Sequence, residues 1–516
     1  MPFQHPPMAP APKCHRAWLM AGALTLTAAG TGWGAYAQDC ANANPATAVA
    51  EVTLTPQWDK PGQTFEGWGT ALAWFAHVTG QLPPPIRTQV ADLLYGQDGL
   101  QLNIARYNIG GGNAPDTPPY LRTGADVPGF WRLTGDAAGW DPANAASWDW
   151  SADAGQRWWL DAIRDRVPEK DRIFEAFSNS PPYFMTVSGR VSGHTDGLQD
   201  NLRPGEEGRF AAYLVRVTGE LERRHHIVFR TLSPVNEPGT PYWFAANSQE
   251  GAHWSPARQA QIIKAVHAEL QARGLRTQIA GVDETNPQTF MLDWAGLDDG
   301  AKAAIEQINV HSYDTTGKAA ARDLAHVTGK RLWMSEVDLS PPNVPQDYDD
   351  MRPAIALGEQ IVSDINRMQP VAWVFWQAVE NETKDPASGS NWGLIKMDFA
   401  NRVSPDIHVT AKYWAMGQFS KYIRPGDRFI PVDDDDTVVA VRPGASGFTA
   451  VHVNPGLLPQ RLTIGLPPEN VKRSYTVSLV VSDSKRHLDK TCPAMPIGDG
   501  AVVVPPMSVT TVRFDR

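Results

Sequence analysis

The strongest constraint on the fold is a repeated pairing of a short apolar run with a helical segment. Apolar runs of strand length recur eight times, and most are followed by a stretch whose apolar residues recur every three or four positions. Strands that alternate with helices predict a parallel sheet, and eight such units predict a closed (β/α)8 TIM barrel. The predicted strands are 65–74, 102–108, 172–178, 229–237, 277–283, 307–311, 332–336 and 371–376, and the predicted helices are 85–95, 153–166, 206–224, 256–273, 317–328, 353–367 and 408–421.

Beyond the last predicted helix the pattern changes to short alternating runs of β-branched residues, separated by Pro, Gly and Asp. This pattern is typical of a β-sandwich. A similar run at 48–55 precedes the barrel and is expected to join a sheet formed elsewhere in the chain. We therefore predict an α/β protein with an N-terminal strand region at 38–60, a catalytic barrel at 61–422 and a β-sandwich domain at 423–516.

The N-terminus has the pattern of a targeting segment. Lys13 and Arg16 precede the apolar run 17–29, and Ala35-Tyr36-Ala37 is a site of small residues that suits cleavage. We predict a signal peptide over 1–37 and hence a secreted or periplasmic protein that leaves the membrane after cleavage. The alternative is an uncleaved anchor, although the apolar run is short for a membrane span. We expect a monomer.

Two cysteines remain after the predicted cleavage. The chain has three cysteines, and Cys14 would leave with the signal peptide. Cys40 and Cys492 lie near opposite ends of the mature chain, and an oxidising compartment favours their pairing. We predict a Cys40–Cys492 disulfide; the alternative is two unpaired thiols.

Charge and motif content exclude some function classes. The net charge of −10 argues against nucleic-acid binding, which usually needs a basic patch. The sequence contains no His-Glu-x-x-His motif and no cysteine cluster, so we expect no metal and no other cofactor. Many of the 19 tryptophans cluster in the first third of the chain. Most will fill the core, but aromatic rings near strand ends also suit the apolar faces of sugars, which points to an oligo- or polysaccharide substrate.

Two of the apolar runs end in a carboxylate. Glu237 follows the run that begins at Phe229, and Glu336 closes the run that begins at Leu332. In a barrel both would emerge at the C-terminal mouth, where barrel enzymes carry their active sites, and strands four and seven face each other across it. Two carboxyl groups about 5 Å apart are the arrangement that retaining glycoside hydrolysis requires.

The two carboxylates can be given separate roles. Asn236 can hold a sugar hydroxyl while Glu237 reaches the leaving oxygen as acid and base. Glu336 would then be the nucleophile, and Arg106 at the end of strand two could keep it ionised. For either Glu alone the alternative is a salt bridge at a strand end.

Several motifs, in this order along the chain, resemble glycoside hydrolase family 30, and within it the endo-β-1,6-galactanase subfamily. They are Gly67–Trp74, Arg106–Gly111, Ser178–Met185, Asn236–Pro238, Trp333–Glu336 and Trp376-Gln377. The resemblance implies a retaining enzyme with a barrel and a side β-sandwich built from the first strand and the C-terminal strands. It also implies that Glu237 is the acid/base and Glu336 the nucleophile.

The remaining predicted contacts with substrate follow from strand ends and from the resemblance. Trp376 is the expected platform beneath the reacting sugar, and Trp243 would flank the leaving group. Trp74 is either a platform or a core residue, and His311 is either a ligand or a satisfied core histidine. Glu284 either binds a hydroxyl or forms a salt bridge. Two further residues complete the predicted reactive subsite: Asn179 and Tyr313.

Three functions compete. The first is hydrolysis of β-1,6-linked galactan, such as arabinogalactan side chains. The second is the same chemistry on xylan, β-1,6-glucan or a glucosyl lipid. The third is a carbohydrate-binding protein without catalysis, against which the presence of both Glu237 and Glu336 speaks. The sequence leaves endo or exo action open, since loops around the mouth decide it.

Overall fold

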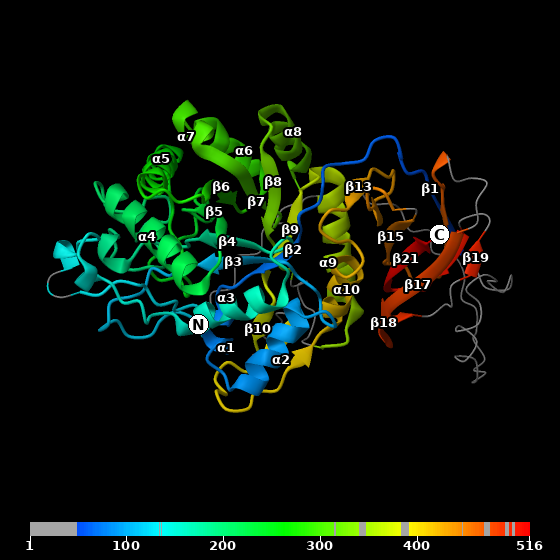
Figure 1. Cartoon of the computed structure of the whole chain (residues 1–516), viewed down its shortest axis with the longest axis horizontal. Helices are drawn as coiled ribbons and strands as arrows, with labels where there is room; N and C mark the ends of the chain where they lie inside the picture. Colours follow the sequence, from blue (N-terminus) through cyan, green and yellow to red (C-terminus); the bar gives the residue numbers. More distant parts are fainter. Residues whose placement is uncertain are drawn as a thin grey trace.

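The computed structural model describes residues 49–515, apart from 134, 136, 314–315, 340–346, 383–391, 446, 469–474, 491–494 and 498–500. The predicted signal peptide and the predicted Cys40–Cys492 disulfide lie outside the described residues. Figure 1 shows a barrel of strands surrounded by helices and, beside it, a second body made of strands. No helix in the described part of the chain is long and apolar enough to cross a bilayer.

Eight parallel strands close the barrel in chain order, which confirms the predicted fold class. Strands β2, β3 and β9 are buried at every position, as expected for strands covered on both faces. The strands are β2 (Gly67–Ala71), β3 (Ile104–Asn108), β4 (Ile173–Phe177), β5 (Phe229–Ser233), β6 (Gln278–Glu284), β7 (Ile305–His311), β8 (Arg331–Glu336) and β9 (Ala372–Gln377). One predicted boundary is wrong: β5 ends at Ser233, so Glu237 lies in the loop beyond the strand.

Helices cover the outside of the barrel (Figure 1). The sequence analysis missed three of them. These are α1, which is only five residues long, and α6 and α7 between β6 and β7, where Gly296 and Asp298 interrupt the apolar spacing. The helices are α1 (Phe75–Thr79), α2 (Pro84–Tyr95), α3 (Ala154–Arg166), α4 (Glu207–His225), α5 (Pro256–Ala272), α6 (Pro287–Gly296), α7 (Asp299–Ala304), α8 (Lys318–Thr328), α9 (Met351–Ser363) and α10 (Ala411–Ser420). Short 3-10 turns lie at 137–139, 145–147 and 183–185, and a π-helical turn (Asp364–Met368) continues α9.

Two sheets packed against each other form the second body. The first has the order β1-β16-β20 and the second β13-β14-β15-β21-β17-β18, with β19 beside β17. The strands are β1 (Ala50–Leu54), β13 (Arg428–Ile430), β14 (Thr437–Val441), β15 (Phe448–Asn454), β16 (Gln460–Ile464), β17 (Tyr475–Asp483), β18 (Arg486–Lys490), β19 (Met495–Ile497), β20 (Ala501–Val504) and β21 (Ser508–Asp515). Strand β1 pairs in parallel with β16, so the run before the barrel does join a distant sheet. Along the chain between β9 and α10, three strands form a further small sheet. They are β10 (Val379–Asn381), β11 (Ile395–Met397) and β12 (His408–Val409).

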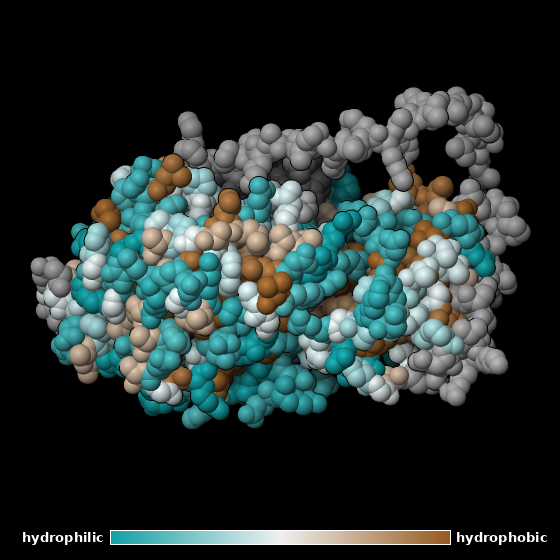
Figure 2. Space-filling view, turned by 90° about the horizontal axis from the view of Figure 1, so that it is seen from above, coloured by the Kyte–Doolittle hydropathy of each residue, from teal (hydrophilic) through white to brown (hydrophobic). Residues whose placement is uncertain are grey.

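The sandwich is fixed to the barrel through α9 and α10, which lie between the two bodies in Figure 1. A cluster that includes Leu54, Phe448 and Phe514 fills the space between the two sheets. Val453 and Val509, on the outer face of the larger sheet, belong instead to the barrel's own core cluster. The two bodies therefore share buried apolar surface. Apolar residues on the face shown in Figure 2 are scattered among polar ones.

Candidate active site

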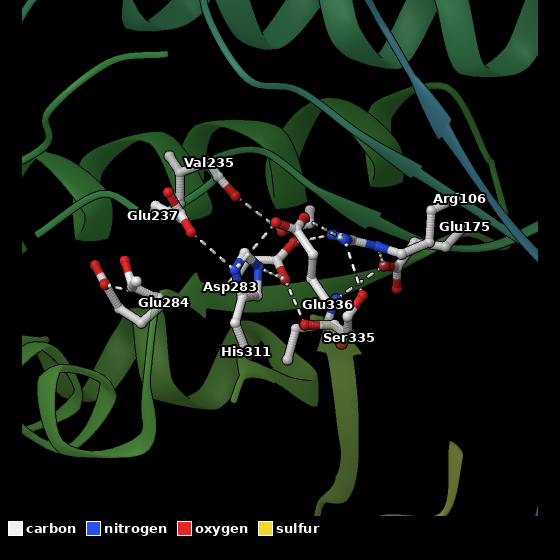
Figure 3. Close-up of polar contacts among 12 residues, drawn as sticks. Arg106, Glu175, Val235, Glu237, Asp283, Glu284, His311, Ser335 and Glu336 are labelled. Atoms are coloured by element: carbon white, nitrogen blue, oxygen red, sulfur yellow. Dashed lines mark hydrogen bonds and ion pairs between the residues drawn. The ribbon is translucent and has the colours of Figure 1, made fainter. Parts of the chain in front are cut away.

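Glu237 and Glu336 meet at the C-terminal mouth of the barrel (Figure 3). Glu336 is the last residue of β8, and Glu237 lies four residues beyond the end of β5. One carboxylate oxygen of each, together with a ring nitrogen of His311 at the end of β7, lie within 4.8 Å of one another. All three residues are buried. The structure thus brings together the two carboxylates that the sequence analysis paired, with a histidine between them.

The backbone of Glu237 is held in place from several sides. Its φ of 47° is unusual for a residue with a side chain. Such a conformation persists only where neighbouring groups fix it. The Glu237 N–H donates to the Asp283 carbonyl at 2.8 Å, and the Glu237 carbonyl accepts from Trp243 Nε1 at 2.9 Å. These bonds aim the Glu237 side chain at the centre of the mouth.

Trp243 therefore helps to hold the backbone of Glu237 through its indole N–H. Its ring is only 1% exposed, which leaves no open face for the leaving group, the role predicted for it. Its neighbour Phe244 is 42% exposed. The predicted contact at Trp243 is corrected by this burial: the chain that follows Glu237 turns the Trp243 ring into the protein and the Phe244 ring outward.

Glu284 anchors the turn that follows Glu237. It accepts hydrogen bonds from the backbone N–H of Gly239 and, at 3.0 Å, of Thr285. Burial and the neighbouring Asp293 carboxyl raise the pKa of Glu284 well above its usual range. A protonated carboxyl in this position can share its proton with Asp293. Glu284 is thus part of the frame around Glu237, and neither of the two roles weighed for it from the sequence describes this contact.

Arg106 lies under the two carboxylates and is fully buried. It donates to Glu175 Oε1 at 2.8 Å, to the Ser335 carbonyl at 3.1 Å and to Glu336 Oε2 at 3.3 Å. It also donates to Asp283. The predicted contact between Arg106 and Glu336 is therefore present. The predicted contact of Arg106 with substrate stays a prediction.

Two buried carboxylates of this network, Glu175 and Asp283, were not predicted from the sequence. Glu175 points into the barrel from the middle of β4 and also accepts hydrogen bonds from Thr231, Gln307 and Asn309. Nothing in its apolar run marks it as special. Asp283 sits near the end of β6, so the reasoning from strand ends that found Glu336 could have found it.

His311 contacts three carboxylates. Its Nδ1 lies 3.2 Å from Glu237 Oε1 and 3.4 Å from Glu336 Oε1, and its Nε2 lies 3.1 Å from Asp283 Oδ1. Burial alone would lower the pKa of His311, but the charge of Glu336 and the bonds to Asp283 and Glu237 raise it to about 10. The three neighbouring carboxylates therefore favour the protonated form of His311. Its side chain is fully buried, and the contact with sugar weighed from the sequence stays a prediction.

The groups around Glu336 have opposing effects on its pKa. Burial raises the pKa of Glu336, the positive charge of His311 lowers it, and the neighbouring Glu237 and Arg106 act in opposite directions, with a resulting pKa of about 7. Tyr313 Oη donates to Glu336 Oε1 at 3.1 Å. This phenol stays protonated, because burial and the charge of Glu336 raise the pKa of Tyr313 well above its usual range. Tyr313 thus contacts the proposed nucleophile, and its predicted contact with substrate stays a prediction.

The segment 312–313 that carries Tyr313 is itself anchored. Ser312 Oγ donates to Asp364 at 2.9 Å, and Trp373 Nε1 donates to the same carboxylate at 2.9 Å. Asp364 opens the π-helical turn that follows α9. Such turns often occur near functional sites. Here the turn places a buried acceptor beneath the chain that follows His311.

Several buried polar atoms at the strand ends have no hydrogen-bond partner among the described residues. Burying such groups without a partner costs free energy, so a polar ligand at this place is the simplest way to satisfy them. They are both amide atoms of Asn179, Oδ1 of Asn236, Oε1 of Gln377 and Nε1 of Trp74. They lie at or just beyond the ends of strands β4, β5, β9 and β2. A sugar presents hydroxyls that can both donate and accept. Gln377 was quoted only as part of a motif, and its orphaned oxygen now marks it as a further candidate contact.

The two predicted platform residues pack against each other. The rings of Trp74 and Trp376 meet edge to face with centroids 5.0 Å apart. The guanidinium of Arg122, from the loop after β3, covers one face of Trp74 at 4.0 Å. Trp376 keeps 8% of its surface exposed and Trp74 only 3%. Trp376 is thus the more exposed of the two, and its role as a platform stays a prediction. Trp74 is a packed residue whose Nε1 has no partner among the described residues.

Glu237, His311 and Glu336 could be considered as ligands of a metal ion, since their atoms are close enough. A histidine binds metal through a neutral nitrogen. Both nitrogens of His311 instead lie within hydrogen-bond distance of carboxylate oxygens of other residues. The arrangement of these residues therefore suits proton transfer and charge stabilisation.

Comparison with known proteins identifies the family. The chain is 30% identical over 428 residues to an endo-beta-1,6-galactanase from Hypocrea rufa, which covers 79% of this chain and 82% of that protein. It is also 30% identical to an exo-beta-1,6-galactobiohydrolase from Bifidobacterium longum subsp. longum, over 80% of this chain but only 35% of that longer protein. Among solved structures, the catalytic domain of GH30 xylanase C from Talaromyces cellulolyticus shares the fold, with a TM-score of 0.63 and 18% identity over 90% of this chain and 99% of that one. The family model for O-glycosyl hydrolase family 30 matches residues 51–325. The chain, a glycosidase, belongs to O-glycosyl hydrolase family 30.

Proposed function

We propose that the protein hydrolyses β-1,6-galactosidic linkages with retention of anomeric configuration. The observation that carries the mechanism is the meeting of Glu237 and Glu336 oxygens, which lie within 4.8 Å of each other. Carboxyl groups about 5–5.5 Å apart leave no room for a water between acid and base, and this separation is typical of retaining enzymes. The names of the two curated relatives support the linkage.

In the first step, Glu237 donates a proton to the glycosidic oxygen while Glu336 attacks the anomeric carbon. The bond to the leaving group breaks, and a glycosyl ester forms on Glu336. Arg106 and Tyr313 each donate to an oxygen of Glu336, so they stabilise this carboxylate before it reacts and when it leaves. His311 Nδ1 lies between the two glutamates, 3.2 Å from Glu237 Oε1 and 3.4 Å from Glu336 Oε1.

In the second step, Glu237 accepts a proton from water, and the water oxygen attacks the anomeric carbon. Glu336 departs as a carboxylate, and two inversions give net retention. Hydroxyls of the reacting sugar would give partners to the unsatisfied atoms of Asn179, Asn236 and Gln377.

Glu237→Ala tests the first step. Substrates with poor leaving groups need a proton from Glu237, whereas an activated aryl galactoside leaves without one. We expect the variant to lose roughly 10²- to 10⁴-fold in turnover of galactooligosaccharides and far less on the aryl substrate. Equal losses on both substrates would assign the acid to another residue.

The linkage is tested by comparing β-1,6-galactooligosaccharides with xylan and β-1,6-glucan. We expect the galactooligosaccharides to be hydrolysed fastest, with the β-anomer appearing first in a proton NMR time course. Xylan is the main competitor, because a solved neighbour of the same fold is named as a xylanase. Faster hydrolysis of xylan would overturn the proposed linkage, and initial release of the α-anomer would overturn the proposed retention. A protein that binds these glycans without cleaving them would support the non-catalytic alternative.

We also propose that the mature protein is exported, as its N-terminal targeting pattern predicts. The support is the sequence pattern of residues 1–37 alone. N-terminal sequencing of the protein recovered outside the cytoplasm should begin at Gln38.

A further inference from the structure

Asp283 is a buried carboxylate that the proposed bond cleavage does not use. It is fully buried near the end of β6. Its Oδ1 accepts from Ser335 Oγ at 2.6 Å and faces His311 Nε2 at 3.1 Å, while its Oδ2 accepts from Arg106. All the contacts that the structure gives this carboxylate are inside the protein, so it acts on the reaction only through its neighbours.

His311 is the neighbour through which Asp283 can act. The imidazole stands between Asp283 on one side and the Glu237 and Glu336 carboxylates on the other (Figure 3). A neutral imidazole has one N–H, so one of its nitrogens would turn a lone pair toward a carboxylate oxygen. Only the doubly protonated ring can donate in both directions. Because His311 has no exposed surface, no solvent can replace either contact.

Asp283 also separates two positive groups. Its two oxygens are divided between Arg106 and His311, so the carboxylate lies between the guanidinium and the imidazole. Without its negative charge, these buried cations would repel each other across a neutral side chain. His311 is the group that can release its proton, since an arginine stays protonated in proteins.

From this geometry we propose that Asp283 is a positioning residue: it keeps His311 doubly protonated, and the resulting imidazolium orients Glu237 and stabilises the charge of Glu336. The roles of the two glutamates rest on the proposed function, but the protonation of His311 does not. The titratable groups that face His311 are Glu237 from the loop after β5, Asp283 from β6, Glu336 from β8 and Tyr313, whose ring centroid is 5.9 Å away. Two further charged groups act on His311 indirectly. Arg106 forms an ion pair with Asp283, and Glu175 forms an ion pair with Arg106.

The protonation of His311 can be measured by nitrogen NMR of the imidazole rings in the full-length protein. The chain has 13 histidines, and the signal that disappears in His311→Gln identifies the one of interest. We expect wild-type His311 to remain doubly protonated up to about pH 9, well above the ordinary histidine pKa of about 6.5. In Asp283→Asn, which keeps the shape but removes the charge, we expect His311 to lose its proton between about pH 6 and 8.

The kinetic consequence separates positioning from a merely structural role. In Asp283→Asn, kcat/KM should fall roughly 10²-fold on the alkaline side, with the alkaline limb following the loss of the His311 proton. Asp364→Asn is the matched control: Asp364 is equally buried but binds Ser312, Trp373 and Lys318 and is not bonded to His311. Its variant should leave the His311 titration unchanged.

A wild-type His311 that is neutral at pH 7 would overturn the proposal, and this measurement stands even where Asp283→Asn fails to fold. Double protonation that persists through pH 9 in a folded Asp283→Asn protein would overturn it as well. The titration needs no substrate. If the protein does not hydrolyse galactan but His311 titrates as expected in the wild-type and Asp283→Asn proteins, the proposed substrate is wrong and the role of Asp283 is supported.

Discussion

At the scale of single residues, the site is a small set of charges shared out by hydrogen bonds. Arg106 and His311 supply positive charge, and Glu175, Asp283, Glu237 and Glu336 supply carboxyl groups. Each charged side chain contacts at least one of opposite sign. Buried charges are tolerated only when they are paired in this way. Because these charges oppose one another, Glu336 titrates near neutral pH, and its role can be tested by the pH dependence of activity.

Removing Glu336 should abolish the proposed covalent route. We expect Glu336→Ala to lower kcat by roughly 10⁴-fold, because no other described carboxylate reaches the same position opposite Glu237. Added azide can occupy the vacated space and attack an activated aryl galactoside, so it should restore part of the rate and yield an α-galactosyl azide. Azide that restores nothing, or a β-azide product, would contradict the role of Glu336 as nucleophile.

The pH dependence of kcat/KM should report the charge on Glu336. The nucleophile works only as a carboxylate, so activity should rise with pH through its raised pKa of about 7. The positive charge of His311 lowers this pKa, so His311→Gln should shift the acidic limb to higher pH. The assay should use an aryl galactoside with a good leaving group, because cleavage of this substrate depends little on protonation by Glu237. His253→Gln, at a histidine paired with Asp200, is the control and should leave the limb in place. A shift to lower pH in His311→Gln would contradict the assignment.

Sequence reasoning found the residues at strand ends and missed those that support them. Glu336 and His311 could be predicted because each closes an apolar run. Glu175 could not, because a charged residue in mid-strand is recognisable only when the donors from neighbouring strands are known. Trp243 was misplaced for a similar reason: the turn of the chain after Glu237 decides which ring is buried, and nothing in the residue types fixes that turn.

At the scale of elements, the loops after β3 and β5 join above the strand ends. The Arg122 N–H donates to the Ser248 carbonyl at 2.8 Å, and its guanidinium donates to Gln249 at 2.6 Å. Further along the same loops, the Gly111 N–H donates to the buried Glu250 at 3.1 Å. Burial raises the pKa of Glu250 to about 8. The strands and most helices follow from periodicity, but these contacts join residues more than 120 positions apart and leave no pattern in the sequence.

Arg122→Ala should weaken the contact between these two loops without changing the surroundings of Glu237 and Glu336. It removes the cation over Trp74 and the bond to Gln249, contacts whose combined worth at an exposed position is about 1 kcal/mol. We expect KM for galactooligosaccharides to rise several-fold while kcat for a short aryl galactoside stays near wild type. Arg132→Ala, an exposed arginine of the same loop paired with Asp149, is the control. A fall in kcat on the aryl substrate would show that Arg122 acts on the chemistry instead.

At the scale of the whole molecule, the barrel and the sandwich behave as one packed body. Strand β1 precedes the barrel yet pairs with β16, and α10 carries polar contacts into the larger sheet. Gln418 on α10 donates to Ser482 Oγ at 2.8 Å and accepts from Thr511 Oγ1 at 2.6 Å. All three side chains are buried between the two bodies. The sandwich is therefore expected to stabilise the barrel, although it contributes none of the residues discussed for the active site.

Gln418→Ala tests this coupling. The change removes one buried hydrogen bond from each of the hydroxyls of Ser482 and Thr511, which keep their bonds to the Trp414 and Gln418 carbonyls, so it should cost about 1–2 kcal/mol. We expect a lower Tm in calorimetry, a single cooperative transition, and unchanged kcat at 25 °C, since Gln418 is remote from Glu237 and Glu336. Gln271→Ala, at an exposed position on α5, should leave Tm within the error of the wild-type value. Two separate transitions in the wild-type protein would show that the bodies unfold independently, and the shared core would then contribute little to the stability of the barrel.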